Sequence, residues 1–552
     1  MKFDASKPTL AIYGIKDIKN SGFPVFVHDH NITFFENGKI SKHLQLERLT
    51  RNKFDNTLDK SIYDILKSEK ILGKDIDIIF VDNVIGRAFI SDDGEIRFET
   101  NIRNDLSTNL EEGKCWWYGK EKKAYVLNHE LAHIYSCIPF FGNFKENSLL
   151  IHFDGGASLS NFSAWIYKNN KLEKIEYHWD LKYLSSLFNA NALSFAIIGA
   201  KEFDQHSVAG KLMGFASFGK YSERLENWLK ENNYFQDIWS KKSIFFEKVK
   251  IDFNIGINSF DQKSTFLQDI AATFQFIFQR DFIDKLMYLR NKTNSEYLYF
   301  TGGSALNILL NSEIVNRKLF KDVFIPPCTN DSGLSIGAGA FLEQLKHGKL
   351  DLHDAFLNNW NIADYNADYT DNDIKQVSKL LVEGKVVGIC NGLAESGPRA
   401  LGNRSILALA NSKNLAKRVS EEHKKREWYR PVAPIMLEKN TKYFTDLEKI
   451  HHLSKHMLLD FKILSDKIKE IEGVVHIDGT SRIQTIFDRT ENPFIYDLLM
   501  ELDINFDIKA LINTSFNVKG EPIVHTIDDA VRSAQNMNLD ALVLNGKAHF
   551  IK

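Results

Sequence analysis

Cysteine is scarce in this sequence: four cysteines are spread over 552 residues, and no two of them form a C-x-x-C pair. This spacing argues against a disulfide framework and against a zinc ribbon. Long apolar runs are also missing, since no stretch approaches the roughly 18 consecutive apolar residues that a membrane-spanning helix requires. The first residues show no basic segment followed by an apolar core, which is the pattern of an export signal. We therefore expect a cytoplasmic protein that does not contact a membrane.

An excess of charge of either sign is absent as well. The sequence has 70 lysine and arginine residues against 72 aspartate and glutamate residues, a formal net charge of −2. A protein that binds a nucleic-acid backbone through a broad basic face has a positive excess, so we expect no nucleic-acid partner. Local clusters of basic residues can still bind phosphate. The length predicts about two to four domains, at roughly 150 residues per domain.

The segment His129-Glu130-Leu131-Ala132-His133 is the first candidate for chemistry. Two histidines four residues apart lie on one face of a helix and can share a metal ion. The same residues spell H-E-x-x-H, the zinc-protease signature in which the glutamate is the general base. The following residues, IYSCIPFFGNF, supply no third ligand, which disfavours that interpretation. Without a metal, both histidines are ordinary helix residues with hydrogen-bond partners.

Two apolar segments end in pairs of glycines. Residues 149–153 run into Asp154-Gly155-Gly156, and residues 297–301 run into Gly302-Gly303. Each pattern indicates a strand that ends where backbone N–H groups can surround a phosphate. Asn37-Gly38 lies between two strand-like arms and predicts a hairpin nearer the N-terminus.

These features resemble the parts of the actin-like ATPase fold, in which two duplicated α/β halves clamp a nucleotide, and by this analogy we expect that fold for residues 1–345. His28 lies at the entry to the hairpin, either as a solvated turn residue or at the rim of a site. Asp331 precedes a run of small residues that permits close helix packing. The stretch 210–219 has three glycines in ten residues and predicts a compact turn near a ligand.

A polar segment, 346–370, predicts a linker, and residues 371–552 are predicted to form a second α/β domain. In this domain Arg399 and Arg404 lie among the glycines of GPRALGNR. A charge run such as KKRE is commonly solvated surface, whereas arginines between turn-forming glycines suit bidentate capture of phosphate. The sequence therefore predicts a second anion site, separate from the first.

Nine segments in order resemble, over nearly the whole chain, the nodulation-type O-carbamoyltransferases, a family that carbamoylates hydroxyl groups of antibiotics and lipo-oligosaccharides. They are VLNHELAH, FDGG, AGKLMGFASFG, FTGGSALN, NDSGLSIGAGA, ESGPRALGNRSILA, KKREWYRPVAP, HIDGTSRIQTI and LINTSFNVKGEPIV. The resemblance implies an actin-like N-terminal domain similar to that of the tRNA threonylcarbamoyl transferases. It also implies a C-terminal YrdC-like α/β domain that forms carbamoyl adenylates.

In the reaction that this resemblance implies, carbamoyl phosphate and ATP give carbamoyl adenylate at the C-terminal site. The N-terminal site then transfers the carbamoyl group to a hydroxyl of a small molecule, either a natural product or a sugar. The resemblance also implies a divalent metal at the N-terminal site. Fe2+ is the first candidate, and Mn2+ and Zn2+ are the alternatives.

Matching the family motifs position by position gives the candidate site residues. His129, His133 and Asp331 correspond to the metal ligands, and His28 corresponds to the base for the acceptor hydroxyl. The nucleotide contacts implied are Asp154, Gly155, Gly156, Gly302, Gly303 and Asn307. The implied carbamoyl phosphate and ATP site comprises Arg399, Arg404, Lys424, Arg430, Arg482, Asn513 and Ser515.

The chain departs from the family pattern at three places. Glu130 stands where the family has the second histidine of H-H-x-x-H, and Ala209 stands where it has a glutamate before Gly-Lys. The segment before His28 is longer than usual. This last departure bears directly on the assignment of His28 as the base.

Two other functions compete with carbamoyl transfer to a small molecule. The first is tRNA modification of the threonylcarbamoyladenosine type, which requires a basic face for RNA that the composition does not indicate. The second is a non-catalytic nucleotide-binding protein of actin-like fold, which has no need of the two histidines, Asp331 and the second-site cations. A zinc protease is the least favoured. The sequence predicts neither the identity of the acceptor nor the choice between monomer and homodimer.

Overall fold

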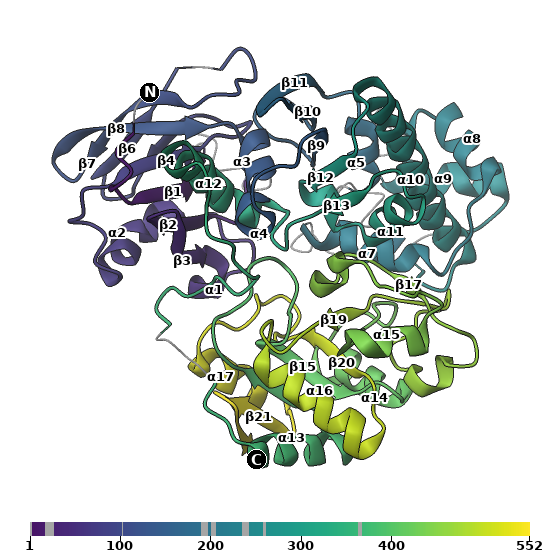
Figure 1. Ribbon diagram of the computed structural model, residues 1–552. Helices are drawn as coiled ribbons and strands as arrows, with labels where there is room; N and C mark the ends of the chain where they lie inside the picture. Colours follow the sequence, from purple (N-terminus) through teal and green to yellow (C-terminus); the bar gives the residue numbers. More distant parts are fainter. Residues whose placement is uncertain are drawn as a thin grey trace.

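The computed structural model describes residues 3–16, 27–101, 103–188, 197–199, 206–234, 242–257, 261–362 and 367–551. In these residues three larger β-sheets, with helices packed on them, form the α/β architecture that the sequence predicts (Figure 1). Two of the sheets belong to the first domain and the third to the second domain.

The first sheet has the strand order β3-β2-β1-β4-β8-β7-β6-β5. The hairpin predicted around Asn37-Gly38 is confirmed, since β2 and β3 are antiparallel on either side of this turn. The strands are β1 (Thr9–Tyr13), β2 (Asn31–Glu36), β3 (Lys39–Gln45), β4 (Asp77–Val81), β5 (Ala88–Ile90), β6 (Ile96–Glu99), β7 (Glu111–Trp117) and β8 (Lys120–Leu127).

The second sheet repeats the connectivity of the first, with the order β11-β10-β9-β12-β13. In both sheets three antiparallel strands come first, and two parallel strands then follow beside the first strand of the three. The repetition confirms the duplicated α/β fold. The strands are β9 (Ser148–Phe153), β10 (Phe162–Lys168), β11 (Lys171–His178), β12 (Tyr297–Thr301) and β13 (Asp322–Phe324).

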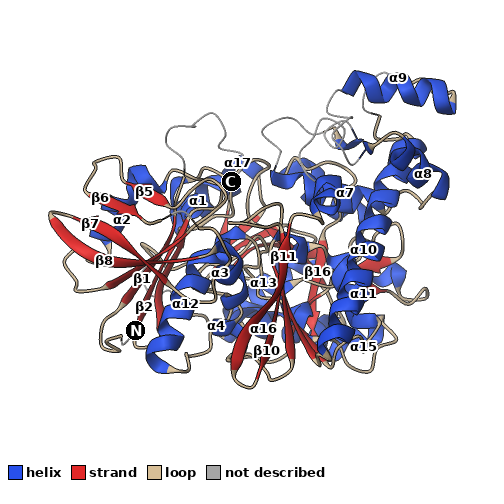
Figure 2. Cartoon of the chain, turned by 90° about the horizontal axis from the view of Figure 1, so that it is seen from above, coloured by secondary structure: helices blue, strands red, loops and turns tan. Residues whose placement is uncertain are grey.

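Helices cover the two sheets and separate one from the other. Figure 2 shows α3, α4 and α12 between the strands of the first sheet and those of the second. The helices of this domain are α1 (Leu46–Thr50), α2 (Leu58–Ser68), α3 (His129–Tyr135), α4 (Ile138–Phe141), α5 (Lys182–Phe188), α7 (Val208–Ala216), α8 (Glu223–Glu231), α9 (Lys242–Phe253), α10 (Thr265–Thr293), α11 (Ile308–Asn316) and α12 (Leu334–His347), with short 3-10 turns η4 (Gly303–Leu306) and η5 (Asp331–Gly333).

The glycine-rich stretch 210–219 is not the compact turn that its composition predicts. Gly210 and Gly214 lie inside helix α7, with Val208, Leu212 and Phe215 buried along one face. The apolar spacing of this stretch at helical intervals outweighed the helix-breaking tendency of its glycines. Among the described residues, no helix combines the length and the apolar character that are needed to cross a membrane.

Gly337 allows α12 to pack against α3 with almost no space between the two backbones. A Cβ atom at Gly337 would lie 1.7 Å from the carbonyl oxygen of Ala132. We expect Gly337→Ala to lower the thermal unfolding midpoint, because over-packing of this kind costs about 1–3 kcal/mol. Gly210→Ala is the matched control. No atom lies within 4 Å of the Cβ position of Gly210, so alanine fits there and should stabilise the helix through its higher helix propensity. Thermal unfolding of both variants is followed by circular dichroism. Equal midpoints would contradict this packing.

The third sheet organises the second domain, with the order β19-β16-β20-β15-β14-β21-β22. Helices α13 and α16 cover one face, where Val387 and Ile389 of β14 meet Leu498 of α16. The elements are β14 (Val387–Cys390), β15 (Arg404–Leu409), β16 (Ala433–Leu437), β17 (Phe461–Lys462), β18 (Thr480–Ser481), β19 (Gln484–Ile486), β20 (Leu511–Ser515), β21 (Ala541–Leu544), β22 (Lys547–Phe550), α13 (Asp371–Val382), α14 (Lys413–Lys417), η6 (Arg418–His423), α15 (Glu438–Phe444), η7 (His452–His456), η8 (Ile468–Ile471), α16 (Pro493–Phe506) and α17 (Ile527–Met537).

The segment between the domains, 346–370, lies against both of them over much of its length, although residues 363–366 are outside the described residues. Trp360 is fully buried in the core of the first sheet, and its indole N–H donates to the carbonyl oxygen of Ile65 at 3.1 Å. Asn358 forms isolated β-bridges with His43 of the first domain and with Ala394 of the second. The segment is therefore a structural bridge between the two cores.

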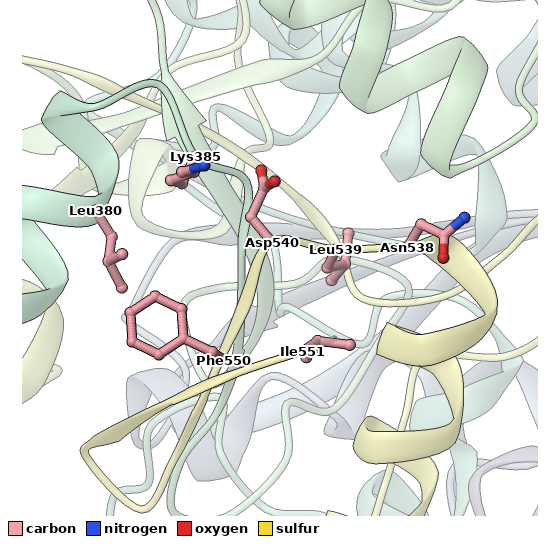
Figure 3. Close-up of a pocket in the computed structure, with 7 residues that line it drawn as sticks. All are labelled: Leu380, Lys385, Asn538, Leu539, Asp540, Phe550 and Ile551. Atoms are coloured by element: carbon pink, nitrogen blue, oxygen red, sulfur yellow. The ribbon is translucent and has the colours of Figure 1, made fainter.

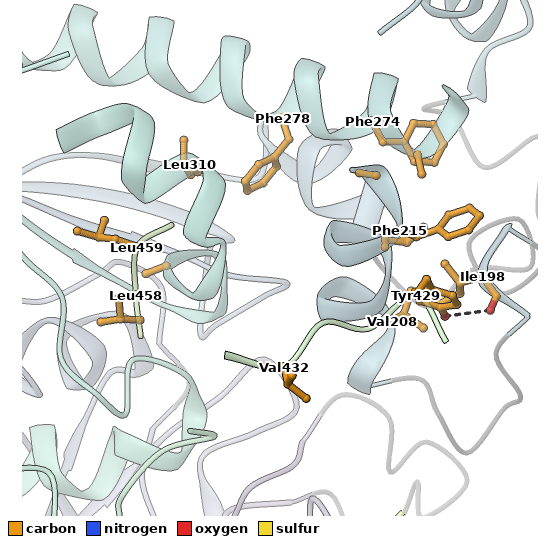
Figure 4. Packing of buried hydrophobic residues seen from close by; sticks show 14 of the residues in the cluster. Ile198, Val208, Phe215, Phe274, Phe278, Leu310, Tyr429, Val432, Leu458 and Leu459 are labelled. Atoms are coloured by element: carbon orange, nitrogen blue, oxygen red, sulfur yellow. Dashed lines mark hydrogen bonds between the residues drawn. The ribbon is translucent and has the colours of Figure 1, made fainter. Parts of the chain in front are cut away.

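An apolar interface joins the second domain to helices α7, α10 and α11 of the first (Figure 4). The Tyr429 hydroxyl donates to the carbonyl oxygen of Ile198 at 3.2 Å, as the dashed line in Figure 4 marks. The two domains thus share one continuous apolar core. Residues that the figure labels in it include Val208, Phe215, Phe274, Phe278, Leu310, Val432, Leu458 and Leu459.

Candidate functional site

Helix α3 places His129 and His133 side by side inside the first domain. Asn128 caps the helix, since its side-chain oxygen accepts a hydrogen bond from the backbone N–H of Leu131 at 2.8 Å. The two histidines are one helical turn apart, and their Nε2 atoms are 3.0 Å from each other. Both side chains are almost fully buried.

Two carboxylates face this histidine pair. Oδ1 of Asp331, on η5, lies 3.5 Å from Nε2 of His129 and 3.4 Å from Nε2 of His133. Oδ2 of Asp154, at the end of β9, lies 3.5 Å from Nε2 of His133. Ligands that are each about 2.1 Å from a tetrahedral ion are roughly 3.4 Å apart, so this donor set fits a divalent metal. The structure thus brings together the three predicted ligands and adds Asp154 to them.

The electrostatics of the cluster keep Asp331 in the form that binds cations. Burial favours the neutral acid, but His129 and His28 hold the pKa of the Asp331 carboxyl well below its usual range. The hydroxyl of Tyr13 donates to the other oxygen, Oδ2, at 2.9 Å, which leaves Oδ1 directed at the histidines. Tyr13 is a residue of the cluster that the sequence did not single out.

His152 is a second residue that the sequence missed. It lies on β9, is completely buried, and stacks on His133 with a ring-centroid distance of 5.0 Å. Neither of its ring nitrogens has a hydrogen-bond partner among the described residues. Burial and the neighbouring His133 and His129 lower the pKa of His152 well below its usual value, so the ring is neutral, the form that ligates metals. The sequence feature that could have identified His152 is its position as the single polar residue in the apolar segment 149–153.

We expect His152→Leu to weaken metal binding at the first-domain cluster by at least about 10-fold, because losing a donor exceeds the usual effect of losing an outer-shell partner. Titration with Co2+, followed by visible absorption, measures the affinity and the ligand field of the tight-binding phase. His549→Leu, on the exposed strand β22, controls for a lost histidine elsewhere. An unchanged spectrum and affinity in His152→Leu would exclude His152 from the ligand set.

Glu130 does not face the histidine pair as a protease base would. Its Oε1 accepts hydrogen bonds from the backbone N–H of Leu159 at 2.9 Å and from the hydroxyl of Ser160 at 3.0 Å. The side chain therefore holds the loop that follows Gly156. This position argues against the zinc-protease interpretation, in which the glutamate activates a metal-bound water.

The two Gly-Gly junctions meet at Asp154. Gly303 donates its backbone N–H to Oδ2 of Asp154 at 2.7 Å, and Gly155 donates to Oδ1 at 2.6 Å. Gly302 has a φ of +95°, and a Cβ atom there would lie 2.2 Å from the carbonyl oxygen of Phe153, so glycine is required. Gly156 lies against the ring of Trp179. The four predicted glycines thus flank one carboxylate beside the histidines.

The side chain of Asn307 forms hydrogen bonds within the first domain. Its Oδ1 accepts from the backbone N–H of Leu310 as the N-cap of α11, and its amide exchanges two hydrogen bonds with Gln275, each 3.0 Å long. The side chain is therefore already committed to helix capping. Its assignment as a nucleotide contact stays a prediction without geometric support.

His28 lies next to the cluster and belongs to a His–Asp pair. Its Nδ1 is 3.0 Å from Oδ2 of Asp29, which also accepts from the side-chain amide of Asn330 at 3.2 Å. Burial opposes the charged ring, but Asp331 and Asp29 raise the pKa of His28 to about 9. At neutral pH the ring therefore carries a proton, so a base role requires these carboxylates to be compensated by a bound cation. Most of the longer segment before His28, residues 17–26, lies outside the described residues.

In the second domain, a buried glutamate shapes the loop that carries Arg399. Oε1 of Glu395 accepts from the backbone N–H groups of Leu401, Asn403 and Arg404 at 2.7, 2.9 and 3.0 Å. Gly397, with a φ of +97°, lets this loop touch the first domain, since a Cβ atom there would lie 2.3 Å from the carbonyl oxygen of Pro327. Pro327 precedes Asp331 by four residues, so the loop contacts the first domain close to Asp331.

Four arginines gather at this loop with few counter-charges. Burial, together with Arg399, Arg426 and Arg430, lowers the pKa of the Arg482 guanidinium well below its usual value. The Nε atoms of Arg399 and Arg482 are buried and have no partner within the described part of the chain. Guanidinium groups stay charged at neutral pH, so their crowding is unfavourable until an anion binds. Arg426 was not among the predicted residues, although it stands within the KKRE motif.

The remaining predicted residues form the frame of this cation cluster. Within the described residues, the hydrogen bonds of the Arg404 guanidinium go to the backbone carbonyls of Asn391, Gly392, Asn403 and His525. Lys424 donates to the carbonyl oxygens of Ser515 and Asn517. These bonds disfavour a direct phosphate contact by Arg404 and Lys424 and indicate a supporting role for both.

Ser515 and Asn513 line the strand end beneath the arginines. The hydroxyl of Ser515 accepts from Nη2 of Arg426 at 3.0 Å and donates to Oδ1 of Asn517 at 2.6 Å. The amide of Asn513 donates to Ala400, while its Oδ1 is buried and lacks a partner among the residues that the structure describes. The structure therefore brings Arg399, Arg430, Arg482, Asn513 and Ser515 together, as predicted by the resemblance.

Glu427 is a carboxylate beside this cluster, and cations from both domains share it. Nζ of Lys211, on α7 of the first domain, is 3.0 Å from Oε1 of Glu427, and Nζ of Lys519 is 2.9 Å from the same atom. Burial would raise the pKa of the Glu427 carboxyl, but Lys519, Arg430 and Lys211 lower it to about 2. The first domain thus contributes directly to the wall of the second site.

A surface pocket of about 500 Å³ lies elsewhere, at the outer edge of the third sheet (Figure 3). Its walls come from Leu380 of α13, from Lys385, from the residues between α17 and β21 (Asn538, Leu539 and Asp540) and from Phe550 and Ile551. None of its lining residues belongs to either of the two sites described above. Its position therefore gives no support for catalysis there.

Comparison with known proteins gives the family. Residues 19–340 match the family described as carbamoyltransferase N-terminus, and residues 378–550 match carbamoyltransferase C-terminus. An uncharacterized protein of Methanocaldococcus jannaschii is 30% identical over 77% of this chain and 82% of its own length. Nodulation protein NolNO of Sinorhizobium fredii is 25% identical over 94% of this chain and 78% of its own length.

A further relative is named for its activity. The 3'-hydroxymethylcephem-O-carbamoyltransferase of Streptomyces clavuligerus is 26% identical over 94% of this chain and 96% of its own length. Both family matches fall on the two domains that carry the clusters described above. The chain therefore belongs to the carbamoyltransferase family, whose enzymes transfer carbamoyl groups.

Proposed function

We propose that this carbamoyltransferase activates carbamoyl phosphate with ATP in the second domain and transfers the carbamoyl group to a hydroxyl in the first. The observation that carries the proposal is the cluster of Arg399, Arg426, Arg430 and Arg482, in which few carboxylates compensate the charge. Carbamoyl phosphate and ATP are polyanions, and guanidinium groups bind phosphate oxygens in a bidentate manner. Their binding would relieve the repulsion among the arginines.

Activation at the second site takes place in two steps. Carbamoyl phosphate reacts with water to give carbamate and inorganic phosphate. A carbamate oxygen then attacks the α-phosphorus of ATP, the bond to the β-phosphate oxygen breaks, and pyrophosphate leaves. The product is carbamoyl adenylate. In both steps the arginines would hold the transferred and departing phosphates and offset the negative charge on them.

At the first site the acceptor hydroxyl attacks the carbamoyl carbon and AMP leaves. The donors that would hold a divalent ion are His129, His133, His152, Asp331 and Asp154. A bound ion would supply Lewis acidity and a template for the phosphate of the adenylate. The hydroxyl proton would go to Nε2 of His28, whose Nδ1 faces Asp29.

The contact between the domains supports the sequence of two transfers. Gly397 of the arginine loop lies against Pro327 of the first domain, and Nη2 of Arg48 donates to the carbonyl oxygen of Gly397 at 2.8 Å. A reactive adenylate made beside this loop would have a short path to the cluster around Asp331. A short path limits the loss of the adenylate to water.

For the acceptor we propose a hydroxyl group of a small molecule, such as a natural product or a sugar. The relative from Streptomyces clavuligerus is named for a hydroxymethyl acceptor, and the relative from Sinorhizobium fredii is named a nodulation protein. The two family matches cover the segments that carry both sites.

The test is pyrophosphate release from ATP by the purified protein, with metal supplied, no acceptor present, and carbamoyl phosphate either added or omitted. Release that depends on carbamoyl phosphate is the expected result. A matched reaction with acetyl phosphate controls for ATP hydrolysis stimulated by any acyl phosphate. Release that is equal with and without carbamoyl phosphate would contradict activation through an adenylate.

A further inference from the structure

A second cluster of metal-binding side chains lies where the two domains meet, apart from both sites described above. Asp322 begins β13 of the first domain, while His451 and His452 lie at the start of η7 in the second domain. The Nε2 atoms of His451 and His452 are 3.2 and 3.0 Å from Oδ1 of Asp322. One ligand atom from each residue lies within 4.8 Å of the other two.

We propose that Asp322, His451 and His452 bind a divalent transition-metal ion such as zinc, and that this ion joins the two domains. Imidazole and carboxylate donors form the set that Zn2+ and Co2+ accept. Two ligands that are each about 2.1 Å from an ion are roughly 3.0–3.4 Å apart at the angles of common coordination geometries. Both measured separations fall in this range, and three protein ligands leave a fourth position for water.

The surroundings fix the orientation of the two imidazole rings. His451 stacks on His452 with a centroid distance of 4.4 Å. His452 also packs on Phe141 and Phe324 of the first domain, at 6.0 and 5.6 Å. Ligands that are held in place before the ion arrives lose little conformational freedom on binding, which favours a site with few donors.

The hydrogen bonds of these residues are compatible with an ion. Oδ1 of Asp322, which faces both Nε2 atoms, also accepts from the backbone N–H of Val323 at 2.9 Å, and this bond fixes the carboxylate toward the two rings. The backbone N–H of Leu453 donates to Nδ1 of His451 at 3.3 Å, which leaves the proton of the neutral ring on Nε2. Metal binding at Nε2 would require that proton to move to Nδ1, so the hydrogen bonds of His451 with Asp322 and with the N–H of Leu453 would both be exchanged for a metal–nitrogen bond.

Exposure distinguishes this cluster from the first one. The side chains of Asp322, His451 and His452 are 29%, 20% and 32% exposed, whereas those of His129 and His133 are 2% and 1% exposed. A chelator therefore reaches an ion at the domain interface more rapidly than one in the first-domain cluster. The two sites can be separated in one protein by the rate at which each loses metal.

The experiment uses the full chain, loaded with Co2+ and freed of excess ion. We expect two ions per chain by elemental analysis, of which a brief exposure to EDTA removes one. Asp322→Asn should hold one ion from the start, because its affinity at the interface falls by at least about 10-fold. His549→Gln, a histidine on the exposed strand β22, should hold two. Full retention of both ions by Asp322→Asn would overturn the proposal.

A second measurement tests whether the ion joins the domains. Hydrogen–deuterium exchange in β13 and in residues 451–458 should slow when Co2+ is added and recover after the brief EDTA exposure, and Asp322→Asn should show neither change. If exchange is the same with and without the ion, the two histidines bind it without joining the domains, and the proposal fails. If the unaltered chain binds no ion that the brief EDTA exposure removes, the cluster is a hydrogen-bonded contact and the proposal fails as well, whether or not the first-domain cluster holds an ion.

Discussion

His133→Ala should abolish carbamoyl transfer to an acceptor while leaving pyrophosphate release that depends on carbamoyl phosphate intact. His133 lies 3.4 Å from Asp331, 3.5 Å from Asp154 and 3.0 Å from His129, so it takes part in three of the four close pairs described for the first cluster, the fourth being His129 with Asp331. Because even outer-shell partners of a metal contribute about 10- to 100-fold, losing this donor should lower the transfer rate by about 100-fold or more. The arginines of the second domain are not altered by the change.

Two assays on the same preparation separate these activities: carbamoylated product by mass spectrometry and pyrophosphate by a coupled enzyme. His43→Ala is the control, since His43 is a buried histidine of the same domain whose Nδ1 pairs with the hydroxyl of Thr33 at 2.9 Å. It should keep both activities if it folds. An equal loss of both activities in His133→Ala, with the fold intact, would mean that one site performs both steps.

Arg482→Ala should stop pyrophosphate release and, in the absence of ligands, raise the thermal unfolding midpoint. A charge-assisted hydrogen bond to phosphate contributes about 1.5–3 kcal/mol, which corresponds to roughly 10- to 150-fold in rate. Without ligands, the same guanidinium is buried near Arg399, Arg426 and Arg430, and its removal relieves their repulsion. Functional sites commonly sacrifice stability in this manner.

Loss of pyrophosphate release together with a higher unfolding midpoint distinguishes this result from misfolding, because a variant that merely misfolds loses stability and activity together. Arg489→Ala is the matched control: Arg489 lies on the surface of the same domain and pairs with Asp497 at 2.8 Å. Its removal should change stability by less than about 1 kcal/mol and leave pyrophosphate release unaltered. Normal release by Arg482→Ala would remove Arg482 from the phosphate site.

Local patterns in the sequence were enough to predict the elements that hold the first cluster. The Asn37-Gly38 turn, the capped helix that begins at His129 and the two strands that end in glycine pairs all lie where their residues predict them. Each of these depends on interactions within a few residues. Their assembly around Asp154 depends on long-range pairing of β9 with β12, which the duplicated fold supplied.

The contributions that sequence reasoning missed come from contacts between distant residues. Tyr13 and His152 reach the first cluster from β1 and β9, where their spacing carries no metal-binding signature. Arg404 looked like a phosphate ligand, but the structure shows its donors turned to backbone carbonyls. A residue type predicts the chemistry available at a position, whereas the neighbours that fold against it decide how that chemistry is used.

The burial of Trp360 bears on the order in which the protein completes its fold during synthesis. This side chain fills the core of the first sheet, yet it follows the last helix of the first domain by more than ten residues. A nascent chain that has just left the ribosome up to residue 345 therefore lacks one side chain of its own core. The first domain completes its core only after the segment that leads to the second domain has emerged, so the last step in its folding coincides with the start of synthesis of the second domain.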